Sequence, residues 1–141
     1  TWYLIRHGEL LGYSETEHLM VAAIARYHRR GLPKKRHESW QLIEGREERR
    51  TVSEMALLLR LAAALDRRPQ ALIGSLKVKA VGPKGAATGV RILLRPHPAE
   101  PGQPAPDLSL ECWSLRSCAD AVAEASGLAL GVEGPEGLTP A

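Results

Sequence analysis

The residues best suited to bind a charged ligand lie between positions 26 and 37, in the sequence RYHRRGLPKKRH. This stretch, the basic turn, holds six lysines and arginines and two histidines, and it contains no acid. Arginine binds phosphate oxygens through paired hydrogen bonds, and lysine binds them as a point charge. The chemistry that this composition indicates is the binding of a phosphate-rich anion.

A simpler explanation covers part of this charge. Gly31 and Pro33 are typical of a helix end, and cations in the last turn of a helix stabilise it by a few tenths to about 1 kcal/mol each. The residues at 34–36 lie beyond Pro33, where their mutual repulsion is unfavourable unless an anion relieves it. We therefore assign substrate binding to Arg26, His28, Arg29, Arg30, Lys34, Lys35, Arg36 and His37.

Two more charged residues lie in the apolar segment that follows. Arg60 is surrounded by apolar residues and needs a partner, for which a buried counter-ion or a phosphate would serve. Asp66 falls in the last turn of the predicted helix, where a carboxylate opposes the helix dipole. A salt bridge to Arg67 or Arg68, or a cap for the next segment, is the simpler explanation of Asp66. Both residues join the candidate substrate-binding set.

The sequence offers no catalytic or metal-binding motif. A metal-dependent phosphohydrolase of the helical HD type needs an adjacent His-Asp pair, and none is present. The motifs GxSxG and HExxH and a glycine-rich phosphate loop are also missing. Cys112 and Cys118 lack the spacing of a zinc site, so we interpret them as structural thiols. We interpret His7 and His18 as residues with no special role.

Helical signals dominate the first half of the chain. Ser14 and Glu17 form a capping box ahead of apolar residues at helical spacing, which predicts a helix that ends at Gly31. A second helix begins at Gly45 or at Thr51 and ends before Pro69. Its middle is apolar on every side except at Arg60, which predicts burial in a bundle. The sequence ESWQLI between them predicts another helical turn, with Trp40 in the core.

The second half has the pattern of a sheet. Alternating or branched residues in LKVKAV, GVRILLRP and LSLECWSL predict three antiparallel strands, with Trp113 packing on the sheet. A proline-rich loop precedes the third of them. Ser117 and Gly127 bound a short predicted helix, and LALGVEG predicts a last strand. The boundary between the halves falls near residues 70–74.

Two long stretches together resemble the helical C-terminal domain of the exopolyphosphatase and guanosine-pentaphosphate phosphohydrolase (Ppx/GppA) family. They are YLIRHGELLGYSETEHLMVAAIARYHRRGLPKKRHESW and TVSEMALLLRLAAALDRRP, and their most specific parts are ARYHRRGLPKKRH and LLRLAAALDR. The later stretch LECWSLRSCADAVAEASGLAL is similar, more weakly, to the terminal sheet and helix of that family.

The resemblance implies a fold for this chain and different functions for the domains of the family. The fold is expected to be α+β: an N-terminally truncated HD-like helical bundle over residues 1–72, then a small antiparallel sheet with one helix over residues 73–134, and a disordered tail over residues 135–141. In the family, N-terminal actin-like domains of the same chain bind Mg²⁺ and hydrolyse phosphoanhydride bonds. The helical domain has lost a complete metal site and helps to form a basic channel. His28 and Asp66 match family positions.

We therefore expect an accessory domain that is not itself catalytic and has no cofactor of its own. It would bind and align polyphosphate, or guanosine pentaphosphate, for the N-terminal catalytic domains, which carry the Mg²⁺ of the intact enzyme. The alternatives are a nucleic-acid-binding module, which the aromatic content of 4% does not favour, and an independent HD-type metal phosphohydrolase. A homodimer is compatible with each of them. The cysteine usage indicates a cytoplasmic protein, and no apolar run is long enough for a membrane span.

Overall fold

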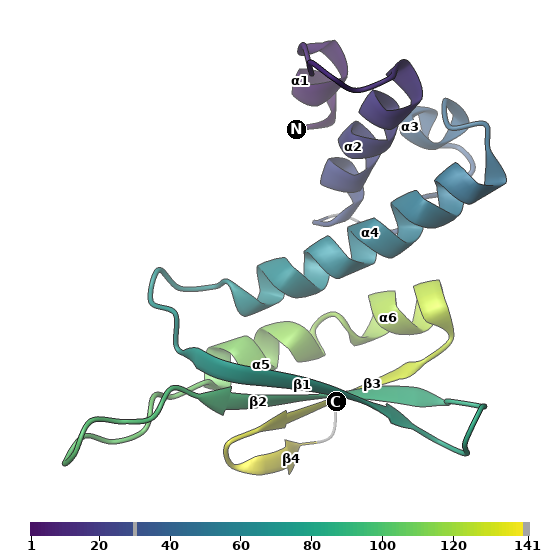
Figure 1. Cartoon of the computed structure of the whole chain (residues 1–141). Coiled ribbons are helices and arrows are strands. Elements are labelled where there is room, and N and C mark those ends of the chain that lie inside the picture. The colour runs from purple at the N-terminus through teal and green to yellow at the C-terminus, as the bar shows by residue number, and fades with distance from the viewer. Residues whose placement is uncertain (30, 140–141) are drawn as a thin grey trace. The chain divides into compact units, whose positions relative to one another are not determined.

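The structure is a computed structural model that describes residues 1–29 and 31–139 (Figure 1). The chain divides into two compact units, Thr1–Arg60 and Leu61–Ala141. This division lies within a helix, earlier than the boundary expected from the sequence.

The first unit is helical. It contains α1 (Trp2–His7), α2 (Glu15–Tyr27), α3 (Glu38–Gln41) and most of α4 (Arg46–Leu65). The predicted capping box is confirmed: the backbone N–H of Ser14 donates to the Glu17 carboxylate at 2.8 Å, and the Ser14 hydroxyl accepts the N–H of Glu17 at 3.3 Å. Because α4 begins directly after Gly45, the alternative start at Thr51 is wrong.

A small cluster of side chains forms the core of this unit. Its buried members are Ala23, Tyr27, Ile43, Val52 and Ala56, and the half-buried Trp40 packs against them as predicted. The prediction that the long second helix is buried on every side is wrong. In α4, 46% of Met55, 59% of Leu58 and 41% of Leu59 is exposed, because the core cluster takes up only one side of the helix.

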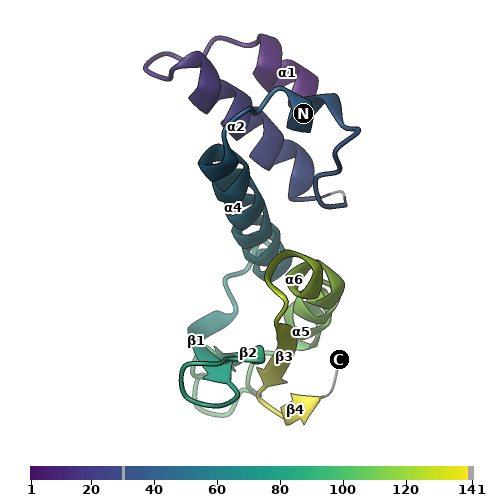
Figure 2. The ribbon, with the colours of Figure 1, turned by 90° about the vertical axis from the view of Figure 1, so that its right-hand side faces the viewer.

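The second unit is a four-stranded sheet with two helices on one face (Figures 1 and 2). Its strands are β1 (Ile73–Val81), β2 (Gly89–Pro96), β3 (Ala129–Gly134) and β4 (Gly137–Thr139), and they lie in that order. The helices are α5 (Ser109–Arg116) and α6 (Ala119–Ser126), which pack against β3. The core beneath them includes Ile92, Leu94, Leu115, Val122 and Val132.

The α+β class is confirmed, and so are the strands predicted in LKVKAV, GVRILLRP and LALGVEG. The strand predicted in LSLECWSL is wrong, because this segment begins α5. Leu108, Cys112 and Leu115 are buried at helical spacing. The polar residues between them also produce an alternation that is typical of a strand, which explains the wrong prediction. Trp113 is consequently 59% exposed on a helix and does not pack on the sheet.

Because this segment is helical, the sheet also differs from the predicted one. A chain segment that contains α5 and α6 connects β2 to β3, so the two strands pair in parallel and the sheet is mixed, not antiparallel. It carries two helices where one was expected. Ser117 ends α5 and does not cap α6, whose N-cap is Cys118. Gly127 ends α6 in the left-handed conformation, with a φ of 72°, as its predicted role requires.

The expected disordered tail is wrong for residues 137–139, which form β4 and pair with β3. Residues 140 and 141 lie outside the described residues. None of the helices within the described part of the chain combines the length and the apolar character needed to cross a membrane.

Candidate anion-binding site

The basic turn connects the end of α2 to the start of α3 and closes on itself through one histidine. The His37 backbone N–H donates to the Lys34 carbonyl at 2.8 Å, and the Lys34 backbone N–H donates to His37 Nδ1 at 3.2 Å. These two bonds fold residues 34–37 into a tight loop, so the cations at 34–36 leave the backbone close to the His37 ring.

The core holds the His37 ring in place. Tyr27, which is 1% exposed, stacks on it with ring centroids 5.7 Å apart and an interplanar angle of 17°. The Tyr27 hydroxyl lies 2.7 Å from the hydroxyl of Ser39 and 3.2 Å from His37 Nδ1. Because Nδ1 accepts the Lys34 N–H, the neutral ring carries its proton on Nε2, which remains able to donate.

The electrostatics of His37 show which cations gather there. Burial lowers the pKa of His37, and the charges of Arg26, Arg36 and Lys34 lower it further. These cations come from the last turn of α2 and from the loop after Pro33, so the fold brings both sides of the turn to one ring. Among the described residues, no carboxylate lies within ion-pair distance of any of the three.

The other described cations of the turn are not among the charges that lower the pKa of His37. Arg29 and Lys35 are exposed, and Arg30 lies outside the described residues. His28 is half-buried, and its Nδ1 lies 2.8 Å from the Ala25 carbonyl, so the ring caps the end of α2. The structure thus brings together Arg26, Lys34, Arg36 and His37, and it gives His28 a structural contact.

Arg60 also contacts this region. Its Nε donates to the His28 carbonyl at 3.0 Å, and its Nη2 donates to the Tyr27 carbonyl at 2.8 Å. The expected counter-ion or phosphate is therefore not needed to explain Arg60, because the terminal carbonyls of α2 accept its hydrogen bonds. This contact joins residues more than 30 positions apart, which sequence spacing does not reveal.

Arg49 plays a similar part at α3, although no pattern in the sequence singles it out. Its Nε donates to the Ile43 carbonyl at 2.6 Å, and its guanidinium lies 5.6 Å from the centre of the Trp40 ring. Arg49 and Arg60 are thus cations that hold the first unit together, unlike those around His37.

Asp66 follows the last residue of α4, belongs to the second unit and is exposed. Neither proposed salt bridge forms, since Arg68 pairs with the buried Glu111 at 3.1 Å and Asp66 makes no ion pair within the described part of the chain. Asp66 also lies outside the helical turn to which it was assigned.

A comparison with models of known protein families shows to which family the chain belongs. The model of the Ppx/GppA phosphatase family, domain III, matches residues 1–92, which include the whole basic turn. The chain belongs to this family. No curated protein and no solved structure matches it.

The described residues form no site for the Mg²⁺ that the resemblance assigns to the N-terminal catalytic domains. Among residues 1–29 and 31–139, no three His, Cys, Asp or Glu side chains gather closely enough to hold a metal ion. His37 also lies near the charges of Arg26, Arg36 and Lys34, which repel a divalent ion.

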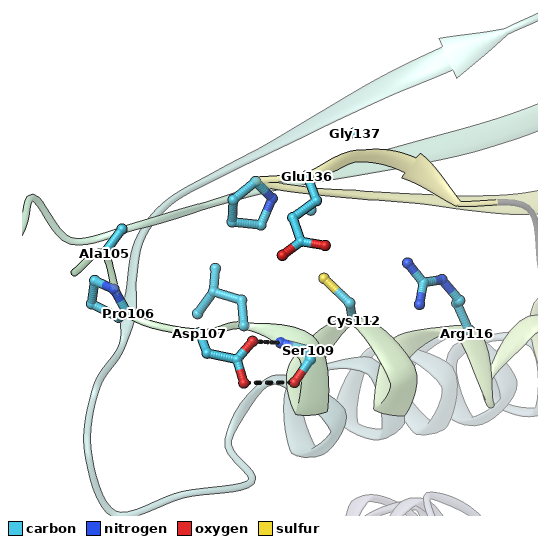
Figure 3. Close-up of a pocket in the computed structure, with 11 residues that line it drawn as sticks. Ala105, Pro106, Asp107, Ser109, Cys112, Arg116, Glu136 and Gly137 are labelled. Atoms are coloured by element: carbon cyan, nitrogen blue, oxygen red, sulfur yellow. Dashed lines mark hydrogen bonds between the residues drawn. The ribbon is translucent and has the colours of Figure 1, made fainter.

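Beyond the part that matches the Ppx/GppA model, the second unit contains a cavity of about 500 Å³ (Figure 3). Cys112, Arg116 and Glu136 point into it, between α5 and the turn before β4. Burial raises the pKa of the Cys112 thiol, which disfavours the reactive thiolate. The cavity presents charges of both signs, so it does not resemble the uniformly cationic turn.

Proposed function

We propose that this chain is an accessory domain that binds polyphosphate and aligns it for hydrolysis by the catalytic half of an exopolyphosphatase-type enzyme. Membership in the Ppx/GppA phosphatase family supports the coarser part of this proposal, a domain III of an exopolyphosphatase-type protein. The basic turn supports the finer part.

The observation that supports substrate binding most strongly is the gathering of Arg26, Lys34 and Arg36 around one histidine with no carboxylate beside them. Their repulsion is unfavourable in the free protein, and a polyanion relieves it. A polyphosphate carries about one negative charge per phosphate, so the release of its counterions adds to the affinity, as it does for nucleic acid backbones.

Polyphosphate fits the turn better than guanosine pentaphosphate does. Binding of a guanine base calls for an exposed aromatic ring or a pocket beside the phosphates. Tyr27 is 1% exposed, and Trp40 is half-buried beside Arg49. The same lack of an exposed aromatic ring at the turn disfavours the binding of nucleic acid there. Competition among long polyphosphate, guanosine pentaphosphate and RNA tests this order of preference.

The direct test neutralises the turn with Lys34→Gln, Lys35→Gln and Arg36→Gln in the same chain. A matched control removes three exposed cations elsewhere, with Arg46→Gln, Arg67→Gln and Lys84→Gln. We expect the turn variant to lose on the order of 100-fold in affinity for long polyphosphate at 0.1 M salt, since each phosphate contact contributes roughly a factor of 5 to 8. If the turn variant binds as the control does, the proposal is wrong.

A further inference from the structure

One face of the sheet in the second unit is not covered by the helices. Side chains of a strand alternate between two faces, and Ile92, Leu94 and Val132 are buried on the face under α5 and α6. The neighbouring residues Arg91 and Glu133 must then point to the opposite face, where they are only half-buried. Figure 2 shows both helices on a single side of the sheet.

Strand pairing places a second group of cations on this open face. Lys79 lies directly opposite Arg91 in the antiparallel β1–β2 pair, and Lys77 lies opposite Leu93. Lys77 and Lys79 are two residues apart and so share a face, with a separation of about 7 Å along the strand. We call Lys77, Lys79 and Arg91 the sheet cluster.

The sheet cluster is unfavourable for the isolated sheet. Like charges directly opposite each other on neighbouring strands destabilise the pair. None of the three side chains forms an ion pair with a carboxylate of the described residues. Glu133 on the same face does not relieve the repulsion, because it is bound to Arg95 at 3.1 Å.

A simpler explanation covers only part of the cluster. β1 is an edge strand, and lysines on an edge strand discourage pairing with other molecules. This accounts for Lys77 and Lys79. It does not account for Arg91, which lies on an interior strand and faces one of those lysines across the pair.

We propose that the open face of the sheet is a second binding surface for a linear phosphate polymer, contacted through Lys77, Lys79 and Arg91. The choice of polyphosphate over another polyanion rests on the function proposed above. It agrees with the face itself, where β1, β2 and β3 present no aromatic ring on which a nucleic acid base could stack.

If two separate surfaces bind one polymer, the affinity of the protein for that polymer depends on the length of the polymer chain. Once one surface holds a long chain, binding to the other becomes intramolecular and is strengthened by the effective concentration of the tethered segment. A short polyphosphate that occupies only one surface gains nothing from the other. Loss of the sheet cluster should therefore weaken the binding of long chains much more than that of tripolyphosphate.

The experiment compares the variant Lys77→Gln, Lys79→Gln, Arg91→Gln with the turn variant and the three-cation control, all in the full chain. Affinities for tripolyphosphate and for long polyphosphate are measured at several salt concentrations. We expect the sheet variant to reduce the salt slope for long chains by about 2, since each lost contact removes roughly 0.7. The charge-preserving variant Lys77→Arg, Lys79→Arg should bind as the unmodified chain does.

The outcomes separate this inference from the function proposed above. If the sheet variant binds long chains as the control does, the sheet surface is refuted, whatever the turn variant does. If the sheet variant loses affinity and the turn variant does not, the sheet surface stands and the turn is not the substrate site.

A chain that shows no salt-dependent binding to polyphosphate refutes both proposals. A preference of the open face for RNA over polyphosphate of equal charge also overturns the inference. Circular dichroism and thermal unfolding confirm that each variant is folded.

Discussion

The basic turn and the sheet cluster both concentrate positive charge, but their residues are brought together in different ways. In the turn, the cations are neighbours in the sequence, and a loop closed through His37 keeps them together. In the sheet, they come from two strands, and only the pairing register makes Lys79 the neighbour of Arg91. A charge cluster that is contiguous in sequence can be predicted before the fold is known, whereas one assembled by strand pairing cannot.

The largest expected effect comes from neutralising both clusters in one chain with all six substitutions to Gln. If both clusters contact the same polymer, affinity for long polyphosphate should fall on the order of 10⁴-fold at 0.1 M salt. Isothermal titration or fluorescence anisotropy measures the loss. A six-fold variant that binds no more weakly than the turn variant alone would show that only the turn contacts the polymer.

The next effect separates cations that bind a ligand from cations that support the fold. Arg60→Met keeps the apolar stem but removes the hydrogen bonds to the Tyr27 and His28 carbonyls. We expect the free energy of unfolding to fall by about 2 kcal/mol, because hydrogen bonds from a charged donor are lost. Urea denaturation measures this change. A stable variant with weakened polyphosphate binding would contradict the structural role and make Arg60 a substrate contact.

A smaller effect tests whether the sheet cluster opposes stability. Lys79→Glu places opposite charges across the pair with Arg91, and cross-strand pairs of this kind contribute roughly 0.2 to 1 kcal/mol. We expect a higher melting temperature together with weaker binding of long polyphosphate. Lys84→Glu in the exposed β1–β2 turn is the matched control and should change neither quantity appreciably. A lower melting temperature for Lys79→Glu alone would contradict the repulsion.

The smallest effect is the pH dependence that His37 gives to folding. Its pKa in the folded chain lies below the ordinary value of 6.5, so the unfolded chain binds protons more readily. The stabilisation is complete above about pH 6.5 and is lost as the pH falls toward the folded-state pKa. His37→Asn should flatten this part of a pH series of urea denaturation curves. An unchanged pH profile would show that His37 does not titrate differently on folding.

Much of the first unit could be predicted from the sequence because its signals are local. Ser14 and Glu17 act within one turn of helix, so the start of α2 could be predicted, but α2 ends at Tyr27, earlier than the end predicted at Gly31. The partner of Arg60 could not be predicted, because the end of α2 is distant in sequence and is brought near only when α4 packs against it. The exposed Leu58 and Leu59 could not be predicted either, since apolar composition does not show how many neighbours a helix has.

In the second unit, one ambiguous segment led to a wrong prediction of the sheet topology. Residues 108–115 fit both a period of 2 and a helical period, and choosing the strand led to an antiparallel sheet. The alternation in LKVKAV does show that Lys77 and Lys79 share a face. That Arg91 joins them depends on a register that the sequence does not encode locally.

The pKa of the His37 ring, measured by NMR with and without saturating polyphosphate, tests most directly whether the turn binds phosphate. In the free chain, Arg26, Lys34 and Arg36 contribute to lowering this pKa. Bound phosphates beside these cations would offset their charge, so we predict that the pKa rises when the polymer binds. An unchanged His37 pKa in a chain saturated with polyphosphate would show that the polymer binds elsewhere.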